Sequence, residues 1–541
     1  MLIDDLKAIQ ERCGHLPADE LNAYADRTST PLYQIQAVAS FYPHFRLHPG
    51  ARTEVHVCTD LACHLRSAQA LFERLAAAGR PPEELEVHRC SCLGVCDAAP
   101  AVMVNDVPVG SADAFPPAAL LDGVVAAVPR PQRLNVDPYP GDPDYSAWRE
   151  LSRGDKSPEE LIALLKESGL RGMGGAGFPS GTKWELVRGA AGSVKYVVCN
   201  ADESEPGTFK DRHILENAPH LVLEGMLLAA TAIGAAEAIL YLRHEYPGPR
   251  AAFDAELRRA KAAGFLEDAP RVRIFDSPGG YICGEETALL EALEGKRAEP
   301  RNKPPFPGTH GLWGRPTLIN NVETFALATA IVHRGAEWYR GQGRNGGVGP
   351  KFFGLSGDVS RPGVYEVPLG LTIRELIEDY GGGTLPGREL YAICPGGASS
   401  GFLPASMADT PLDFRALADV GSMLGSGAVV AIGAGRCMLD LALNLVRFFK
   451  NESCGKCVPC RVGSEKLVAM LEGWRHGRGD AGADLALLEE LAPAMADASI
   501  CGLGQVAPAP IVSALKYWPD EVLAHLREGR CPAGVCPVGR S

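Results

Sequence analysis

The stretch Gly172-Met-Gly-Gly-Ala-Gly-Phe-Pro179 forms a glycine-rich loop and is followed closely by Gly181-Thr-Lys-Trp184. It satisfies the G-x-G-x-x-G spacing at Gly172, Gly174 and Gly177. Glycines let backbone amides approach a phosphate or a flat ring, and Lys183 can add a cation to the same place. The segment before the loop has helical rather than strand periodicity, which weakens the case for an ordinary dinucleotide fold. By itself the loop is weak evidence for a nucleotide site.

Polar side chains follow apolar segments at three later positions, namely Cys199-Asn-Ala-Asp-Glu-Ser-Glu205, Tyr281-Ile-Cys-Gly-Glu-Glu-Thr287 and Ile319-Asn-Asn-Val-Glu-Thr324. The first follows a predicted strand, so its amide and carboxylate groups leave the edge of a sheet. Such groups suit ribityl or ribose hydroxyls and the edge of a flavin ring. The alternative is a polar loop in which Asp and Ser side chains cap helices.

The centre of the chain alternates between two periodicities. Helical segments are predicted at 158–168, 218–233, 249–263 and 285–294, and strands at 195–200, 236–243 and 271–276. This alternation favours a layered α/β domain, which we place at 148–345. A proline-rich segment, 129–147, precedes it and is predicted to be an interdomain linker.

The first 128 residues are expected to form a unit of their own. Three short helices occupy the first fifty residues, and the rest follows a βαββα order, with strands at 53–58 and 85–90, a hairpin at 101–110 and helices at 62–78 and 117–128. That order is typical of a small thioredoxin-like layer.

Two cysteine pairs leave the ends of the strands in this unit, Cys58 with Cys63 and Cys92 with Cys96. Four thiolates on converging loops can hold a [2Fe–2S] cluster. The alternatives are a structural zinc site or four unremarkable thiols, although zinc sites more often use a two-residue spacing. Cys90, beside the set, has no assigned role.

The last third of the chain divides into a small α+β domain at 346–434 and a helical domain at 435–541. Cys454, Cys457 and Cys460 lie at two-residue spacing on one loop, and Cys501 follows at a distance. Three thiolates on a tight loop plus a distant fourth commonly hold a [4Fe–4S] cube, with a zinc site as the alternative.

Three further candidate ligands lie near the C-terminus: His525, Cys531 and Cys536. Two thiols in a Pro-Gly turn close to a histidine predict a zinc ion that fixes the tail. A closed tetrahedral site needs a fourth ligand, which the sequence does not identify. The alternative is a helix cap with surface thiols.

Bulk composition narrows the class of protein. Apolar residues make up 46% and charged residues 22%, which predicts a folded, multidomain chain. The formal charge of −13, with scattered basic residues, argues against a nucleic-acid surface. No secretory signal or membrane span is predicted, because the N-terminus is acidic and the most apolar stretch, 225–236, is too short to cross a bilayer. The sixteen cysteines are therefore expected to be reduced in the cytoplasm.

The N-terminal motifs Cys58-Thr-Asp-Leu-Ala-Cys-His64, Cys92-Leu-Gly-Val-Cys-Asp-Ala-Ala-Pro100 and Phe41-Tyr-Pro-His-Phe45 resemble the thioredoxin-like [2Fe–2S] subunit of respiratory complex I. From about 157 to 518, the loops above, with Lys303-Pro-Pro-Phe-Pro307 and Gly311-Leu-Trp-Gly314, resemble the NADH-binding flavoprotein subunit of complex I and of related NAD-linked hydrogenases and formate dehydrogenases. Two positions depart from that pattern. Met173 stands where most relatives have Arg, and Leu186 where some have an aromatic ring.

The second resemblance implies which residues bind the cofactors. FMN is expected at Gly172, Gly174, Gly175, Gly177, Lys183, Asn200, Asp202, Glu203, Gly284, Asn320 and Asn321. NAD(H) is expected over the flavin near Phe178, Glu205, Glu286, Lys303 and Phe306, with Glu285 in the same cofactor-binding set. The [4Fe–4S] cluster is expected at the cysteines from Cys454 to Cys501, next to the flavin.

The resemblance also implies a fold and a function. The fold is a multidomain α/β protein with a thioredoxin-like domain, a Rossmann-like FMN domain, a β-grasp-like (SLBB) domain and a helical [4Fe–4S] domain. The function is hydride transfer between NAD(H) and FMN, followed by single-electron transfer through the clusters. A partner subunit with further iron–sulfur clusters, of formate dehydrogenase or hydrogenase type, would supply the other half-reaction. The alternatives are the NADH dehydrogenase module of complex I and a non-catalytic iron–sulfur subunit.

Overall fold

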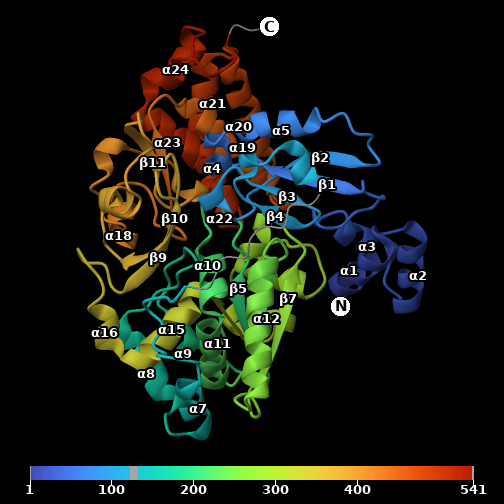
Figure 1. Ribbon diagram of the computed structural model, residues 1–541, viewed down its shortest axis with the longest axis vertical. Helices are drawn as coiled ribbons and strands as arrows, with labels where there is room; N and C mark the ends of the chain where they lie inside the picture. Colours follow the sequence, from blue (N-terminus) through green and yellow to red (C-terminus); the bar gives the residue numbers. More distant parts are fainter. Residues whose placement is uncertain (1, 122–131, 539–541) are drawn as a thin grey trace.

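The computed structural model describes residues 2–121 and 132–538 (Figure 1). Its described part contains three separate β-sheets of four, five and four strands, each with helices packed against it. The expectation of a multidomain α/β protein is therefore confirmed.

The N-terminal unit has three helices followed by a four-stranded sheet in the order β2-β1-β3-β4. β1 pairs with β2 in parallel and with β3 antiparallel, as in the expected thioredoxin-like layer. The helix predicted at 62–78 is broken at Ser67, whose φ of 61° lies in the left-handed region. Of the helix predicted at 117–128, residues 122–128 lie outside the described part. The elements are α1 (Leu2–Cys13), α2 (Ala18–Thr28), α3 (Leu32–Ala39), β1 (Thr53–Cys58), α4 (Leu61–Leu65), α5 (Ala68–Ala76), β2 (Leu85–Cys90), β3 (Val102–Val104), β4 (Val107–Val109) and α6 (Pro117–Leu121).

The proline-rich segment contains no helix or strand from 132 to 145, and the predicted linker residues 129–131 lie outside the described part. The segment is nevertheless packed, because Leu134, Val136 and Tyr139 are buried. The Tyr139 hydroxyl donates to the Glu224 carboxylate at 2.6 Å. Prolines exclude regular structure here, but apolar side chains between them fix the segment against the central domain.

The central domain has a parallel sheet in the order β7-β6-β5-β8. β8 was not expected as a strand, because its five residues end in two asparagines and offer little alternation to detect. Its pairing with β5 places Asn200 opposite Asn321 at the carboxyl edge of the sheet. The elements are α7 (Ser146–Arg153), α8 (Pro158–Ser168), α9 (Ser180–Gly189), β5 (Tyr196–Ala201), α10 (Lys210–Asn217), α11 (Pro219–Ile233), β6 (Glu237–Arg243), α12 (Pro247–Ala262), β7 (Arg271–Ser277), η3 (Tyr281–Gly284), α13 (Glu286–Leu293), α14 (Pro307–His310), β8 (Thr317–Asn321), α15 (Val322–Arg334) and α16 (Ala336–Arg340).

The small α+β domain is a five-stranded sheet in the order β10-β9-β13-β11-β12. Its elements are β9 (Pro350–Gly357), β10 (Gly363–Pro368), α17 (Ile373–Glu375), η5 (Leu376–Tyr380), β11 (Leu390–Cys394), β12 (Leu403–Pro404), α18 (Phe414–Asp419) and β13 (Ala428–Gly433). The helical domain follows, with α19 (Met438–Asn451), α20 (Val458–Arg475), α21 (Ala481–Ala498), α22 (Gly502–Val506), α23 (Ala509–Tyr517) and α24 (Pro519–Arg527).

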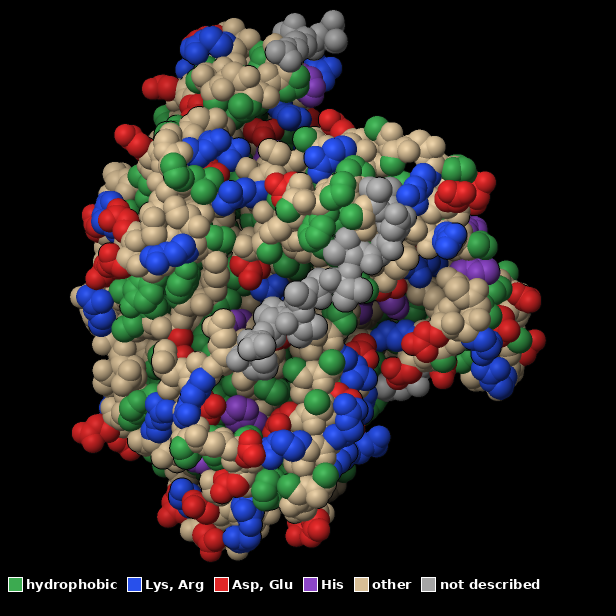
Figure 2. Space-filling model, viewed as in Figure 1, with side chains coloured by type: hydrophobic (Ala, Val, Ile, Leu, Met, Phe, Trp, Pro, Cys, Tyr) green, Lys and Arg blue, Asp and Glu red, His purple; other side chains and the backbone are tan. Residues whose placement is uncertain are grey.

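The thioredoxin-like sheet lies beside the helical domain and above the central domain (Figure 1). His64 Nε2 on α4 lies 2.7 Å from the carboxylate of Asp440 on α19, so the N-terminal unit is in direct contact with the helical domain. Acidic and basic side chains are interspersed over much of the visible face (Figure 2). Across 2–121 and 132–538, helices long and apolar enough to cross a bilayer are absent.

Candidate functional site

The glycine-rich loop connects α8 to α9, so a helix precedes it, as the sequence predicted. Gly175 and Gly177 have φ values of 122° and 64°, which side-chain-bearing residues rarely adopt. A Cβ at Gly174 would lie 3.1 Å from the Cβ of Asn321, so the loop packs directly on the end of β8. The Met173 amide donates to the Thr324 hydroxyl at 2.9 Å, which fixes the loop to the first turn of α15.

The predicted amide and lysine side chains converge on this loop. Asn200 donates to the Gly284 carbonyl at 2.8 Å and accepts from the Asp202 amide at 3.1 Å. Lys183 donates to the Ile319 carbonyl at 2.7 Å, and Trp184 donates to Asn320 at 3.0 Å. Four separate segments of the chain thus meet at the carboxyl edge of the sheet.

Asp202 carries an unsatisfied acceptor at this edge. Its side chain is buried and its Oδ2 atom has no hydrogen-bond partner among the described residues. Burial raises the pKa of its carboxyl well above the usual value. A Cβ at Gly284 would lie 3.0 Å from the Asp202 carbonyl oxygen, so the two segments approach closely here. A ribityl hydroxyl donating to Oδ2 would satisfy the orphaned atom, and the residues present therefore fit FMN.

The Glu203 side chain is bound by the start of α10 and by a tyrosine. Its carboxylate accepts from the amides of Asp211 and Arg212 at 2.8 and 3.0 Å and from the Tyr246 hydroxyl at 2.9 Å. Burial raises the pKa of Glu203 to about 7. The side chain therefore caps α10 and holds the loop in place. Its expected contact with FMN stays a prediction.

Acidic and aromatic side chains border the same edge. Lys303 contacts Glu285 at 2.9 Å and Glu286 at 3.0 Å. Phe178, at the end of the glycine loop, and Phe306, just before α14, both have exposed rings. Exposed rings next to a polar cradle suit stacking against a nicotinamide nucleotide.

The positions of the remaining expected residues are also clear. Glu205 accepts from the Ser399 amide at 2.9 Å, and burial raises the pKa of its carboxyl. Of the two departures from the family pattern, Met173 is buried below the loop with its sulfur 4.0 Å from Lys351 Nζ. Leu186 is exposed on α9.

Cys454, Cys457, Cys460 and Cys501 surround one small cavity. Cys457 and Cys501 are the N-cap residues of α20 and α22. Burial raises the pKa of Cys460 to about 11 and that of Cys501 to about 12, so a bound metal has to replace the protons. Ile282 also lines this cavity and lies in η3, the turn that carries Gly284. The cluster cavity and the flavin cradle are therefore adjacent.

The N-terminal cysteines lie where two strands end, as predicted. Cys58 is the last residue of β1, Cys63 is on α4, and Cys92 and Cys96 follow β2, with their sulfurs 3.3 Å apart. The Gly94 amide donates to the Cys92 sulfur at 3.4 Å. Arg243 at the end of β6 donates to the Cys92 carbonyl at 2.7 Å, which anchors the cluster loop on the central domain.

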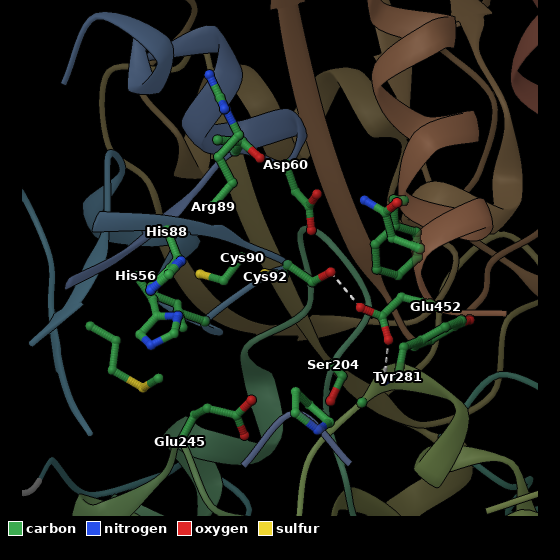
Figure 3. Close-up of a pocket in the computed structure, with 18 of the residues that line it drawn as sticks. His56, Asp60, His88, Arg89, Cys90, Cys92, Ser204, Glu245, Tyr281 and Glu452 are labelled. Atoms are coloured by element: carbon green, nitrogen blue, oxygen red, sulfur yellow. Dashed lines mark hydrogen bonds between the residues drawn. The ribbon is translucent and has the colours of Figure 1, made fainter. Parts of the chain in front are cut away.

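The Glu452 side chain joins the N-terminal cluster loop to η3, and no role was predicted for it (Figure 3). Its carboxylate accepts from the Ser91 hydroxyl, next to Cys92, and from the Tyr281 amide at 2.7 Å. The one feature of the sequence that could have pointed to Glu452 is its place two residues before Cys454. These groups border a polar cavity of about 1280 Å³ that Cys90 also lines, and burial raises the pKa of the Cys90 thiol.

Comparison with known proteins agrees with this geometry. Four family models match successive parts of the chain: thioredoxin-like [2Fe–2S] ferredoxin at 1–124, Nuo51 FMN-binding domain at 165–330, SLBB domain at 352–403 and NADH-ubiquinone oxidoreductase-F iron–sulfur binding region at 440–525. The NADH-quinone oxidoreductase F 2 subunit of Rhizobium meliloti (strain 1021) is 47% identical over 395 residues, which cover 72% of this chain and 93% of that protein. The chain belongs to the family of NADH-quinone oxidoreductase F subunits.

Subunits of hydrogenases are also similar to this chain. The NADP-reducing hydrogenase subunit HndC of Solidesulfovibrio fructosivorans is 42% identical over 412 residues, which cover 74% of this chain and 84% of that subunit. A solved NAD⁺-reducing [NiFe]-hydrogenase in the air-oxidized state matches with a TM-score of 0.86 at 35% identity, covering 96% of this chain and 93% of that one.

Family membership and the matched domains establish the cofactor classes. The chain is an NAD(H)-linked oxidoreductase subunit of the diaphorase type, with an FMN-binding domain and with [2Fe–2S] and [4Fe–4S] domains. The expected fold, enzyme class and cofactors FMN, NAD(H), [2Fe–2S] and [4Fe–4S] are confirmed at this level. The hydrogenase and quinone oxidoreductase relatives are themselves named as subunits of larger enzymes.

Proposed function

We propose that this chain is the diaphorase subunit of an NAD-linked hydrogenase- or formate dehydrogenase-type complex. It would transfer hydride between NAD(H) and FMN and pass single electrons to or from a partner that carries further iron–sulfur clusters. The observation that carries this proposal is the joining of the thioredoxin-like unit and the flavoprotein unit in one chain. The match to the solved NAD⁺-reducing hydrogenase covers 96% of the chain and therefore includes both units.

The residues have distinct tasks in this proposal. The loop at Gly172–Gly177, with Lys183, Asn200, Asn320 and Asn321, would hold FMN, and the unpaired Asp202 oxygen would accept from its ribityl chain. When bound, FMN supplies the exchange between a two-electron hydride step and one-electron steps. Phe178 and Phe306 would stack on the nicotinamide nucleotide, while Glu205, Glu286 and Lys303 bind its polar groups. No side chain is needed as an acid or base, so binding and orientation are the protein's contribution.

The exit for electrons would be the [4Fe–4S] site. Val458, beside Cys457, is 58% exposed, and Val462 one turn later is also exposed. An apolar surface next to a half-buried cluster suits a docking partner. We infer a cytoplasmic location from the reduced cysteines that the clusters require.

Cofactor analysis of the purified chain tests the proposal. We expect one FMN and about six iron atoms per chain, from one [2Fe–2S] and one [4Fe–4S] cluster. A chain without flavin would contradict the diaphorase role and favour a purely electron-transferring subunit.

Native mass spectrometry of the complex identifies the partner. A hydrogenase or formate dehydrogenase catalytic subunit is expected to copurify. Subunits of a quinone oxidoreductase would instead support the second candidate, a complex I module, which the 47% identity to a quinone oxidoreductase subunit favours.

Glu205 tests the assignment of the nucleotide site. Glu205→Ala is expected to raise the KM for NADH by about tenfold, because a hydrogen-bonding group is lost, while FMN stays bound. Steady-state dye reduction measures the KM and absorbance measures the flavin. Loss of the flavin in this variant would place Glu205 in the FMN site.

A further inference from the structure

A fourth metal-ligating residue joins the three candidates near the C-terminus. Cys437, His525, Cys531 and Cys536 have ligand atoms that all lie within 4.8 Å of one another. Cys437 comes between β13 and α19, His525 is on α24, and the other two are in the tail. In the described ranges this is the one group of three or more such residues close enough to hold a single ion.

The spacing of the ligand atoms matches one tetrahedral ion. Bonds of about 2.3 Å to sulfur and about 2.0 Å to nitrogen place two sulfurs about 3.8 Å apart, and a sulfur and a nitrogen about 3.5 Å apart. The Cys437 and Cys536 sulfurs are 3.6 Å apart, and Cys437 Sγ lies 3.5 Å from His525 Nε2. A [4Fe–4S] cube separates its cysteine sulfurs more widely than 4.8 Å, so the group is too compact for one.

The histidine is oriented for metal binding. Its Nδ1 lies 3.0 Å from the Glu521 carbonyl, which can only accept, so Nδ1 carries the proton and Nε2 presents its lone pair to the thiols. A metal-binding histidine typically bonds its other ring nitrogen to such an acceptor. The Glu521 side chain accepts from the Met438 amide at 2.7 Å and the Tyr391 hydroxyl at 2.6 Å, and so holds α24 against the start of α19 and against β11.

The surroundings indicate a structural ion. His525 has 0% of its surface exposed, and Cys437 and Cys536 are also buried. Four protein ligands leave no open position for a substrate or water, which is the pattern of structural rather than catalytic zinc. Thiolate and imidazole ligands select zinc over magnesium or calcium.

We propose that the chain binds one Zn²⁺ through Cys437, His525, Cys531 and Cys536. The ion fastens the tail after α24 to the start of α19. Because the other end of α19 leads into the loop of Cys454, the ion stabilises the helical domain around the [4Fe–4S] site without taking part in electron transfer. The proposal does not depend on the proposed function, since it concerns ligands outside the flavin and cluster sites.

Metal analysis of the full-length protein tests this site. Wild type is compared with Cys536→Ser, with Cys536→His, and with Cys13→Ser as the matched control, because Cys13 is a half-buried thiol on α1 outside every site. We expect one zinc per chain in wild type, in the control and in Cys536→His, where imidazole replaces the thiolate. Cys536→Ser should lose most of the zinc, while iron and FMN stay unchanged.

Three results would overturn the proposal. The first is wild-type protein that lacks stoichiometric zinc after purification in chelator-free buffer containing zinc. The second is a Cys536→Ser variant that retains all its zinc. The third is wild-type protein that holds an extra iron atom in place of zinc. If Cys536→Ser does not fold, thiol alkylation of wild type decides. Chelation should then speed modification of Cys531 by about tenfold or more, because a metal-bound thiolate is protected, and equal rates would refute the site.

Discussion

The two four-cysteine sites differ in their exposure to solvent. In the thioredoxin-like unit Cys58, Cys63, Cys92 and Cys96 are each no more than 4% exposed. At the other site Cys454, Cys457 and Cys501 are only half-buried, and Val458 beside them is exposed. Single electrons leave a protein most readily from a centre near its surface. We therefore expect electrons to leave from the [4Fe–4S] site and the enclosed [2Fe–2S] site to store them.

Removing a ligand of the exit cluster should have the largest effect. Cys460→Ala is expected to lower the iron content from about six to about two and to slow NADH-driven reduction of the native partner by about 100-fold or more. Dye reduction at the flavin should remain within about threefold, since hydride transfer precedes the cluster. Iron analysis and the two assays measure this. Undiminished partner reduction would show that electrons leave by another route.

The matching change in the enclosed cluster should have a smaller effect. Cys96→Ala is expected to lower the iron content to about four, while partner reduction keeps about half or more of its rate. The same assays apply, and electron paramagnetic resonance identifies the cluster that remains. A loss as severe as that of Cys460→Ala would place both clusters on one route and remove the distinction.

Removal of the proposed zinc should affect stability rather than electron flow. Chelation is expected to lower the midpoint of thermal unfolding of the helical domain by roughly 5 °C, because the ion binds only the folded tail. Partner reduction at ordinary temperature should stay within about twofold. Calorimetry before and after chelation, with zinc added back, measures the change. A large loss of activity that zinc restores would assign the ion a role in electron transfer.

Replacing Cys90 should have the smallest effect, and this variant tests which cysteines hold the [2Fe–2S] cluster. It is the last residue of β2, two positions before Cys92, and both cysteines line the polar cavity. Cys90→Ser is expected to leave the iron content at about six and the [2Fe–2S] spectrum unchanged. If the iron content fell to about four, Cys90 would be a ligand and one of the four assigned cysteines would not.

Contiguous patterns in the sequence determined much of this protein. The strand periodicity at 53–58 and 85–90 placed two cysteine pairs at strand ends, and the structure has β1 and β2 at those residues. The helix at 158–168 is also present with the same bounds. Such elements are predictable because their spacing of apolar residues and their caps lie within a few residues of one another.

Tertiary packing alone decided the remaining features. Cys437 meets a histidine 88 positions later, and Ser91 meets a carboxylate 361 positions later. Glu203 accepts from the amide of Asp211 eight positions later, and the short β8 forms because β5 lies beside it. No local periodicity records these pairings. They arise because packing the four domains together brings distant buried polar groups to positions where each needs a partner.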